Sequence, residues 1–216
     1  MRLHVFPPSP RAIKVIALAH HLGLDCERHV VDLFKGDQMK PEFAALNPNK
    51  RMPVLEDDGF VLWESNAILH YLASKKPESG LWPSDAKGQA DVLRWLSWEA
   101  AHWTPACSPM AFERVVKKLA GLGDPNLEEV AKGEKQFHQF AEVLNAHLKG
   151  RKWLLDEQLT IADFSVGAPM VMAEAGQYPA ANYPEIVRWY GTLAALPAWK
   201  RAIVLPPPEA LVTQRR

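Results

Sequence analysis

A serine placed where a helix should begin is the first candidate for chemistry in this chain. Ser65 stands twelve residues after Pro53, and an Asp58-Gly59 turn between them joins two expected strands. The hydroxyl and the free backbone N–H groups at a helix start suit a carboxylate. Pro53 opens the first strand at its edge, which leaves the amide of Met52 free to bond a peptide. The pattern predicts a site for a short, acidic, extended peptide; the alternative is a plain hairpin followed by a capped helix.

A second serine, Ser9, precedes Pro10 and Arg11 between the expected first strand and first helix. A strand–helix–strand unit presents its catalytic group at this position, and the unpaired N–H groups of the helix favour an anion there. An ordinary N-cap serine is the alternative. Because the Pro53 and Ser65 segments accompany it, the sequence favours a functional role for Ser9.

An α/β domain must position these residues. Its expected elements are a strand at Leu3–Phe6, a helix from Pro10 to Gly23, a strand at Glu27–Asp32, strands at Pro53–Glu56 and Phe60–Trp63, and a helix at Ser65–Ser74. The first crossover requires a parallel strand pair. The order βαβ followed by ββα is the pattern of a thioredoxin-like domain, expected over residues 1–77.

The second half of the chain is expected to be all-α, over residues 86–205, after a turn-rich linker at residues 77–83. Its expected elements are a helix from Lys87 to Trp103 that Pro105 stops or kinks, helices at Met110–Ala120 and Leu127–Leu148, a capping box at Thr160-Ile161-Ala162-Asp163, helices at Pro184–Leu196 and Pro197–Val204, and an extended tail from Pro206. The fold class is therefore α/β plus all-α.

The composition excludes several classes of protein. Lys and Arg number 25, as do Asp and Glu, so nothing indicates a nucleic-acid or membrane partner. Prolines interrupt the first residues before a signal-peptide segment can form, and no apolar run approaches the ~20 residues of a membrane span. Two distant cysteines, Cys26 and Cys107, fit a reducing compartment, so we expect a cytoplasmic protein. The eight histidines show no metal-ligand spacing, and no metal is expected.

Three segments resemble the cytosolic glutathione transferases, and the resemblance runs from Leu3 to about Val204. They are Ser9-Pro10-Arg11-Ala12-Ile13-Lys14-Val15, Asn47 to Leu55 with Trp63-Glu64-Ser65-Asn66-Ala67-Ile68, and Leu159-Thr160-Ile161-Ala162-Asp163-Phe164. The first is similar to the start of the serine-type classes, theta, delta and related bacterial ones. The resemblance implies glutathione as co-substrate and a homodimer.

Carried over residue by residue, the resemblance implies a glutathione-binding set. Met52 would bond the cysteinyl moiety through its backbone, next to a cis Pro53, and Glu64 and Ser65 would hold the γ-glutamyl end. Gln38 and Arg51 would contact the glycyl carboxylate, with Lys50 as a possible substitute for Arg51.

The catalytic residue that the resemblance implies is Ser9, which would hydrogen-bond the glutathione thiolate. Two departures from the family leave Arg11 as an alternative. Pro7-Pro8 stiffens the loop before Ser9, and Arg11 replaces a residue that is often small or aromatic.

An electrophile pocket is expected around the end of the helix that begins at Lys87. His102, Trp103, Ala106 and Met110 are the candidates, whereas Trp95 and Trp98 fit core packing better. The predicted activity is addition of the glutathione thiol to a hydrophobic electrophile. The alternatives are a transferase-like partner protein without turnover, or a glutathione-dependent isomerase or dehalogenase on the same scaffold.

Overall fold

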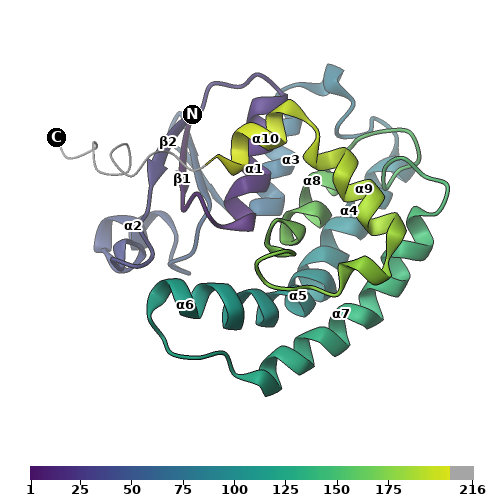
Figure 1. The fold of residues 1–216 in the computed structure, drawn as a ribbon. Helices are drawn as coiled ribbons and strands as arrows, with labels where there is room; N and C mark the ends of the chain where they lie inside the picture. The colour runs from purple at the N-terminus through teal and green to yellow at the C-terminus, as the bar shows by residue number, and fades with distance from the viewer. Residues whose placement is uncertain (205–216) are drawn as a thin grey trace. The chain divides into compact units, whose positions relative to one another are not determined.

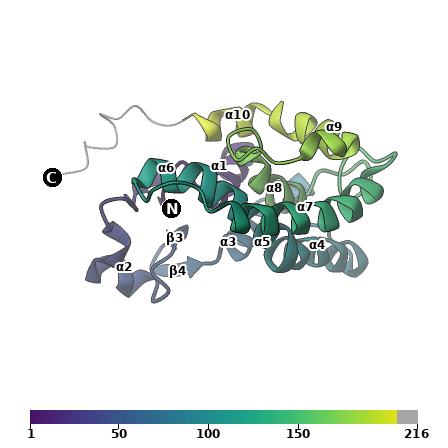
Figure 2. The same ribbon diagram turned by 60° about the horizontal axis from the view of Figure 1, so that its bottom comes forward.

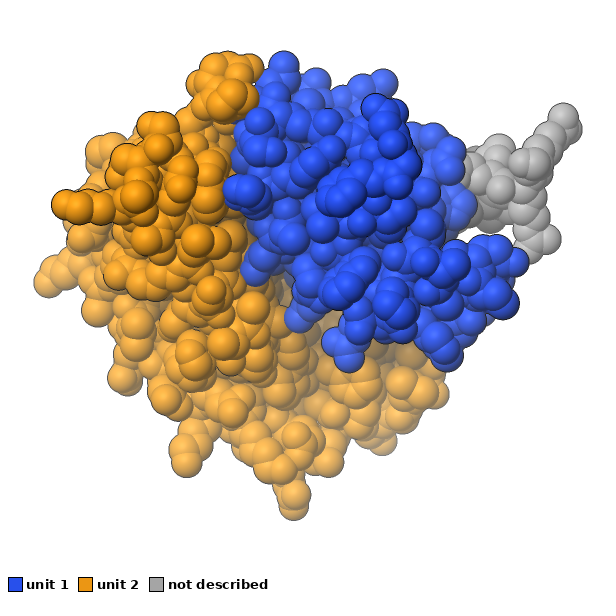
Figure 3. Space-filling view, turned by 180° about the vertical axis from the view of Figure 1, so that it is seen from behind, with its two compact units in different colours: residues 1–76, 195–216 blue, residues 77–194 orange. Residues whose placement is uncertain are grey.

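The computed structural model describes residues 1–204 (Figures 1 and 2), and these fall into two compact units. Among the described residues, unit 1 contains residues 1–76 and 195–204, and unit 2 contains Pro77–Ala194 (Figure 3). The tail expected from Pro206 lies outside the described residues. Within the described residues, no helix is both long and apolar enough to cross a membrane.

A four-stranded sheet forms the centre of unit 1, with strand order β2-β1-β3-β4. The strands are β1 (Arg2–Val5), β2 (Glu27–Val30), β3 (Val54–Asp57) and β4 (Phe60–Trp63). β1 pairs in parallel with β2 and antiparallel with β3, and β3 pairs antiparallel with β4. The predicted parallel crossover and the mixed thioredoxin-like sheet are thus confirmed.

Helices cover both faces of this sheet. α1 (Pro10–His21) packs against α3 (Ser65–Ser74) and against α10 (Pro197–Ile203), as Figure 1 shows. Leu3 and Val5 of β1 are buried on this side. Since side chains alternate along a strand, His4 between them points to the opposite face, beside Phe43 of α2 (Pro41–Leu46).

α2 and the 3₁₀ turn before it, η1 (Asp37–Met39), are absent from the elements that the sequence analysis expected. The helix is only six residues long, too short for a helical period to show. Pro41 begins it, and Phe43 anchors it in a cluster with Val31, Met52 and Val54. That tertiary contact supplies the stability that so short a helix lacks by itself.

Unit 2 is helical, as predicted. Its elements are η2 (Pro77–Ser79), α4 (Ala86–Trp98), the π-helical turn η3 (Glu99–Trp103), α5 (Thr104–Ala111), the π-helical turn η4 (Phe112–Val116), α6 (Lys117–Ala120), α7 (Leu127–Leu148), α8 (Ile161–Gly167), the 3₁₀ turns η5 (Ala168–Met172) and η6 (Ala180–Asn182), and α9 (Pro184–Ala194). α7 has the predicted bounds, and α6 ends at Ala120, as predicted, just before Gly121, whose φ is 65°.

The sequence predicted that Pro105 either stops or kinks the first long helix, and of these two outcomes the stop is wrong. The chain remains helical through this residue, because a π-helical turn precedes it. Thr104 donates its N–H to the carbonyl of Glu99, five residues back. Pro105 then stands in the first turn of α5, where the N–H that proline lacks is least needed.

The capping box at the start of α8 is present and completely buried. The Thr160 side chain accepts a hydrogen bond from the N–H of Ala162, and Asp163 Oδ2 accepts from the N–H of Thr160 at 3.0 Å. Asp163 Oδ1 accepts from the Leu154 N–H and from the Trp189 indole N–H, both at 2.9 Å. One carboxylate therefore joins the start of α8, the loop before it and α9.

We expect Asp163→Asn to lower the free energy of unfolding by about 2 kcal/mol or more, because one carboxylate oxygen becomes an NH2 group that cannot accept, and a buried donor without its acceptor costs roughly 1–3 kcal/mol. Thr160→Ala should cost about 1 kcal/mol, the usual cost of a lost cap. The measurement is urea unfolding at pH 7. Glu128→Gln, an exposed change on α7, serves as control, and an Asp163→Asn variant as stable as this control would contradict the role of the carboxylate.

Candidate functional site

The sheet register brings the predicted site segments to one end of unit 1. β1 ends at Val5 and leads to Ser9; the β1–β3 ladder reaches its last pair at His4 and Val54, just after Met52. Val54 in turn pairs with Trp63, the last residue of β4, which leads to Ser65. The end of β1, the start of β3 and the end of β4 therefore lie side by side. The segments next to them, which carry Ser9, Met52 and Ser65, meet at the same end of the sheet.

Ser9 is the N-cap residue of α1, but its hydroxyl does not cap the helix. Its carbonyl accepts from the N–H groups of Ala12 and Ile13 at 2.9 Å each, and its own N–H donates to the Phe6 carbonyl at 2.8 Å. The backbone is thus held on both sides while the side chain is left out of the cap. Arg11 is half-buried in the first turn of the same helix.

Asn47 shapes the loop that leads to β3. Its buried side chain donates to the Arg51 carbonyl at 2.6 Å and accepts from the Asn49 N–H at 3.0 Å. Lys50 takes a left-handed backbone conformation within this loop, with φ 54°. Lys50 and Arg51 are exposed, and the peptide bond between Met52 and Pro53 is cis. The sequence motif contains Asn47, yet sequence reasoning gave it no role.

Glu64 and Ser65 form the junction between β4 and α3. Glu64 is the N-cap residue with φ 71°, a conformation unfavourable for a side chain with a Cβ and one that clusters at functional sites. Its side chain is exposed and does not cap the helix. Ser65 is 6% exposed in the first turn of α3, so the helix N-terminus and a hydroxyl lie together there.

Gln38 lies in η1, on the segment that follows β2. Its side-chain oxygen Oε1 is buried and has no hydrogen-bond partner among the described residues. The neighbouring Asp37 fixes this turn, since Oδ1 pairs with Lys40 at 2.6 Å and Oδ2 accepts from the Asp32 N–H at 3.1 Å. The Lys40 contact is the main reason that the pKa of Asp37 is lowered. An unpaired amide oxygen on a fixed turn is suited to a ligand donor.

The residues expected to line an electrophile pocket have different surroundings within unit 2. Trp103, Ala106 and Met110 are completely buried, and the Trp103 indole donates to the Val166 carbonyl at 3.0 Å. His102 is exposed and stacks on Phe140, with the ring centroids 5.0 Å apart. Of the four, only His102 has surface to offer a substrate, and the pocket stays a prediction.

The cysteines show no feature of a reactive thiol. Burial, followed by the charge of Glu99, raises the pKa of Cys107 well above its usual value, and burial raises that of Cys26. Among residues 1–204, no group of three or more His, Cys, Asp or Glu side chains is arranged to hold a metal ion.

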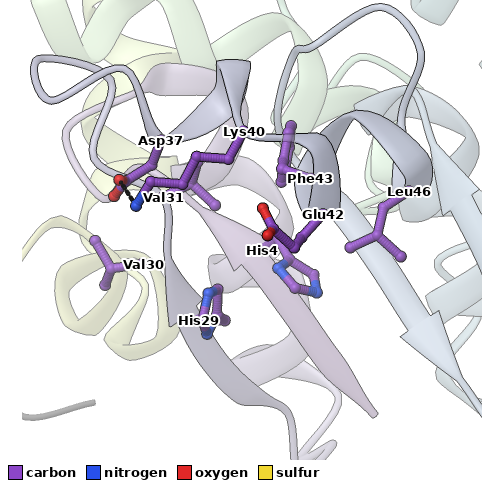
Figure 4. A pocket seen from close by; sticks show the side chains of 9 residues that line it. All are labelled: His4, His29, Val30, Val31, Asp37, Lys40, Glu42, Phe43 and Leu46. Atoms are coloured by element: carbon purple, nitrogen blue, oxygen red, sulfur yellow. Dashed lines mark ion pairs between the residues drawn. The ribbon is translucent and has the colours of Figure 1, made fainter. Parts of the chain in front are cut away.

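A cavity of about 170 Å³ lies between the sheet and α2. Figure 4 shows its labelled side chains: His4 and His29 come from adjacent strands, and Asp37, Lys40 and Phe43 come from the segment that covers them. His4 Nε2 contacts Glu56 Oε1 at 2.5 Å, and its buried Nδ1 has no partner among the described residues.

Two family models match the chain: glutathione S-transferase, N-terminal domain, over residues 1–74, and glutathione S-transferase, C-terminal domain, over residues 100–197. The chain belongs to the glutathione S-transferase family. Glutathione S-transferase 3 of Zea mays is 36% identical to it over 97% of each chain. Glutathione S-transferase D7 of Drosophila melanogaster is 32% identical over 92% of this chain and 87% of its own.

Solved structures of this transferase family have the same fold. Glutathione S-transferase III in its apo form superposes with a TM-score of 0.84 at 33% identity, covering 96% of this chain and 98% of its own. A Pseudomonas fluorescens family member with two glutathione bound superposes with a TM-score of 0.82 at 28% identity, covering 95% and 92%.

Burial lowers the pKa of His4, although the hydrogen bond to Glu56 opposes the shift. In the unfolded chain this ring titrates near ~6.5, so the unfolded state binds more protons as the pH falls below that value. We expect the free energy of unfolding to decrease from pH 6.5 down to the lowered pKa. His20 and His21 are shifted in the same direction, so His4→Gln should flatten the slope without abolishing it. Urea unfolding at pH 7.5, 6.5 and 5.5 measures this, and an unchanged slope would contradict it.

Proposed function

We infer that this protein is a glutathione transferase which activates the glutathione thiol and joins the sulfur to a hydrophobic electrophile. The observation that carries this proposal is the register of β1, β3 and β4, which gathers Ser9, Met52 and Ser65 at one edge of unit 1. The Ser9 hydroxyl there suits a thiol, the backbone of Met52 just before the β1–β3 ladder suits a peptide backbone, and the N-terminus of α3 suits a carboxylate.

Ser9 is proposed as the partner of the glutathione sulfur. A free thiol titrates near ~8.5, and lowering its pKa by about 2 units requires about 2.7 kcal/mol of preferential stabilisation of the thiolate. The hydroxyl, which the cap does not use, and the N-terminus of α1 together supply a hydrogen bond and a partial positive charge. Arg11, in the first turn of the same helix, is the alternative source of positive charge.

The two carboxylate ends of glutathione are assigned to different segments. Ser65 and Glu64 would hold the γ-glutamyl end, where Ser65 meets the carboxylate at the start of α3 and the exposed Glu64 meets the ammonium group. At the other end, Arg51 or Lys50 would pair with the glycyl carboxylate. The buried Oε1 of Gln38 would accept a hydrogen bond from an N–H group of the ligand. Met52 would bond the cysteinyl backbone beside the cis Pro53.

The chemical step then needs little more than alignment. The thiol releases its proton to solvent, the sulfur forms a bond to the electrophilic carbon, and a leaving group departs or a double bond opens. Holding both reactants together supplies much of the rate enhancement. We place the electrophile near His102, and we propose a cytoplasmic homodimer, as the family resemblance implies. A transferase-like partner protein without turnover and a glutathione-dependent isomerase or dehalogenase are the alternatives.

Ser9→Ala should lower kcat with 1-chloro-2,4-dinitrobenzene by tenfold or more, about 1.4 kcal/mol, with little change in KM for glutathione. Loss of the hydrogen bond should raise the pKa of the bound thiol, so the pH–rate profile should move to higher pH. Steady-state kinetics between pH 5.5 and 9 measure both. Arg11 is the thiolate partner if Ser9→Ala keeps full kcat and an unshifted pH–rate profile, while Arg11→Ala lowers kcat and shifts the profile.

Arg51→Ala and Ser65→Ala should weaken glutathione binding while changing kcat much less, because these contacts are equal in ground and transition states. Calorimetric titration with reduced glutathione measures the affinity, and Lys76→Ala at the end of unit 1 is the control. No heat and no thermal stabilisation of the parent protein at about 10 mM glutathione, where linkage predicts a shift even for millimolar affinity, would favour the partner-protein alternative.

A further inference from the structure

A second cavity, of about 280 Å³, lies in unit 1 at the C-terminal end of α1. Three basic side chains line it, His20 of α1, Arg28 of β2 and Arg201 of α10. Ser9 is at the opposite end of the same twelve-residue helix, about 18 Å away at a rise of 1.5 Å per residue. The cavity is therefore separate from the proposed glutathione site.

The fold places these cations together from distant parts of the chain. Arg28 pairs in register with Leu3, so both side chains point to the sheet face that α1 covers. α10 packs against α1 and contributes Arg201 from its last turn. Leu3 and Ile16 also line the cavity and give it an apolar floor.

No counter-charge neutralises the two arginines within the described residues. Arg28 Nη2 donates to His20 Nε2 at 2.7 Å, which makes that imidazole the acceptor and leaves it neutral. Near the end of α1, the carbonyls of His20 and Ala19 accept hydrogen bonds from the N–H groups of Gly23 and Leu24. Asp25 lines the cavity, but no ion pair joins it to Arg28 or Arg201.

The electrostatics show that the positive charges repel one another. Burial, followed by Arg201, lowers the pKa of Arg28. Burial, followed by Arg28 and then Arg201, lowers the pKa of His20. An anion between these groups would remove the repulsion and would favour a proton on the ring.

We propose that this cavity binds the phosphate group of a small phosphorylated molecule. Guanidinium groups bind phosphate through paired N–H donors, and two of them face the cavity. With Asp25, the ionised groups sum to one positive charge, and a proton on His20 makes two, which balances a phosphate monoester of about −1.5 to −2. The volume leaves room for a compact organic group beside the phosphate, above Leu3 and Ile16.

The test is an NMR titration of the full chain with glucose 6-phosphate, inorganic phosphate, acetate and glucose at constant ionic strength. We expect saturable shifts at Arg28, Arg201 and the His20 ring with the two phosphate compounds, with dissociation constants at or below about 1 mM. Acetate and glucose should bind at least tenfold more weakly. Saturation should also raise the pKa of His20, whose charged neighbours are Arg28 on β2, Arg201 on α10 and Asp25 in the loop.

Variants separate binding from a structural role. Arg28→Gln and Arg201→Gln should each weaken phosphate binding about tenfold, the typical value of a lost charged hydrogen bond. Asp25→Asn should tighten it, because a like charge is removed. Lys200→Gln removes one positive charge from the exposed neighbour of Arg201 on α10 and should leave the affinity for phosphate unchanged. Arg201 is also exposed, so its variant stays informative if Arg28→Gln fails to fold.

Three outcomes would overturn the proposal. The first is no saturable shift with either phosphate compound at 20 mM. The second is acetate binding as tightly as phosphate, which would make the cavity a general anion site. The third is an equal loss of phosphate affinity in Arg201→Gln and Lys200→Gln, which would show that binding depends only on the net charge of the protein.

Discussion

Unit 1 depends on the hydrogen-bonded register of β3, which lies between β1 and β4. One ladder sets His4 opposite Val54, and the other sets Val54 opposite Trp63. A shift by one residue would turn Val54 and Leu55, both completely buried, toward the wrong faces, so burial fixes this register firmly. The same register fixes where Met52 lies relative to the ends of β1 and β4, and the proposed chemistry depends on that placement.

α1 connects the two sites proposed in unit 1, and its ends differ physically. The N-terminus has unpaired N–H groups and a serine that does not cap them, so an anion is favoured there. Near the C-terminus the carbonyls of His20 and Ala19 accept from Gly23 and Leu24, and the basic side chains of the second cavity lie beside them. Each end therefore attracts an anion, by backbone groups at one and by side chains at the other.

Buried polar groups in both units are held by specific partners. Lys14, 1% exposed on α1, donates to Asn66 on α3 at 2.7 Å, which ties the helix that begins after Ser9 to the helix that begins at Ser65. In unit 2, Asp163 accepts hydrogen bonds from three segments, the loop at Leu154, the start of α8 at Thr160 and α9 at Trp189. Such groups are costly when unpaired, so each pair favours one arrangement of the helices it joins.

The sequence by itself determined the elements whose signals are local. The Asp58-Gly59 turn, the start of α3 at Ser65, the full length of α7 and the capping box at Thr160 depend on residues within one or two turns of each other. The family resemblance, confirmed by the matches over both halves, added the glutathione site as a set of segments. Only the tertiary structure decided that α2 forms on Phe43, that the chain stays helical through Pro105, and that Trp103 and Met110 are buried. It alone brought Arg28 and Arg201 to one cavity, because packing between residues far apart in sequence leaves no periodic trace in the chain.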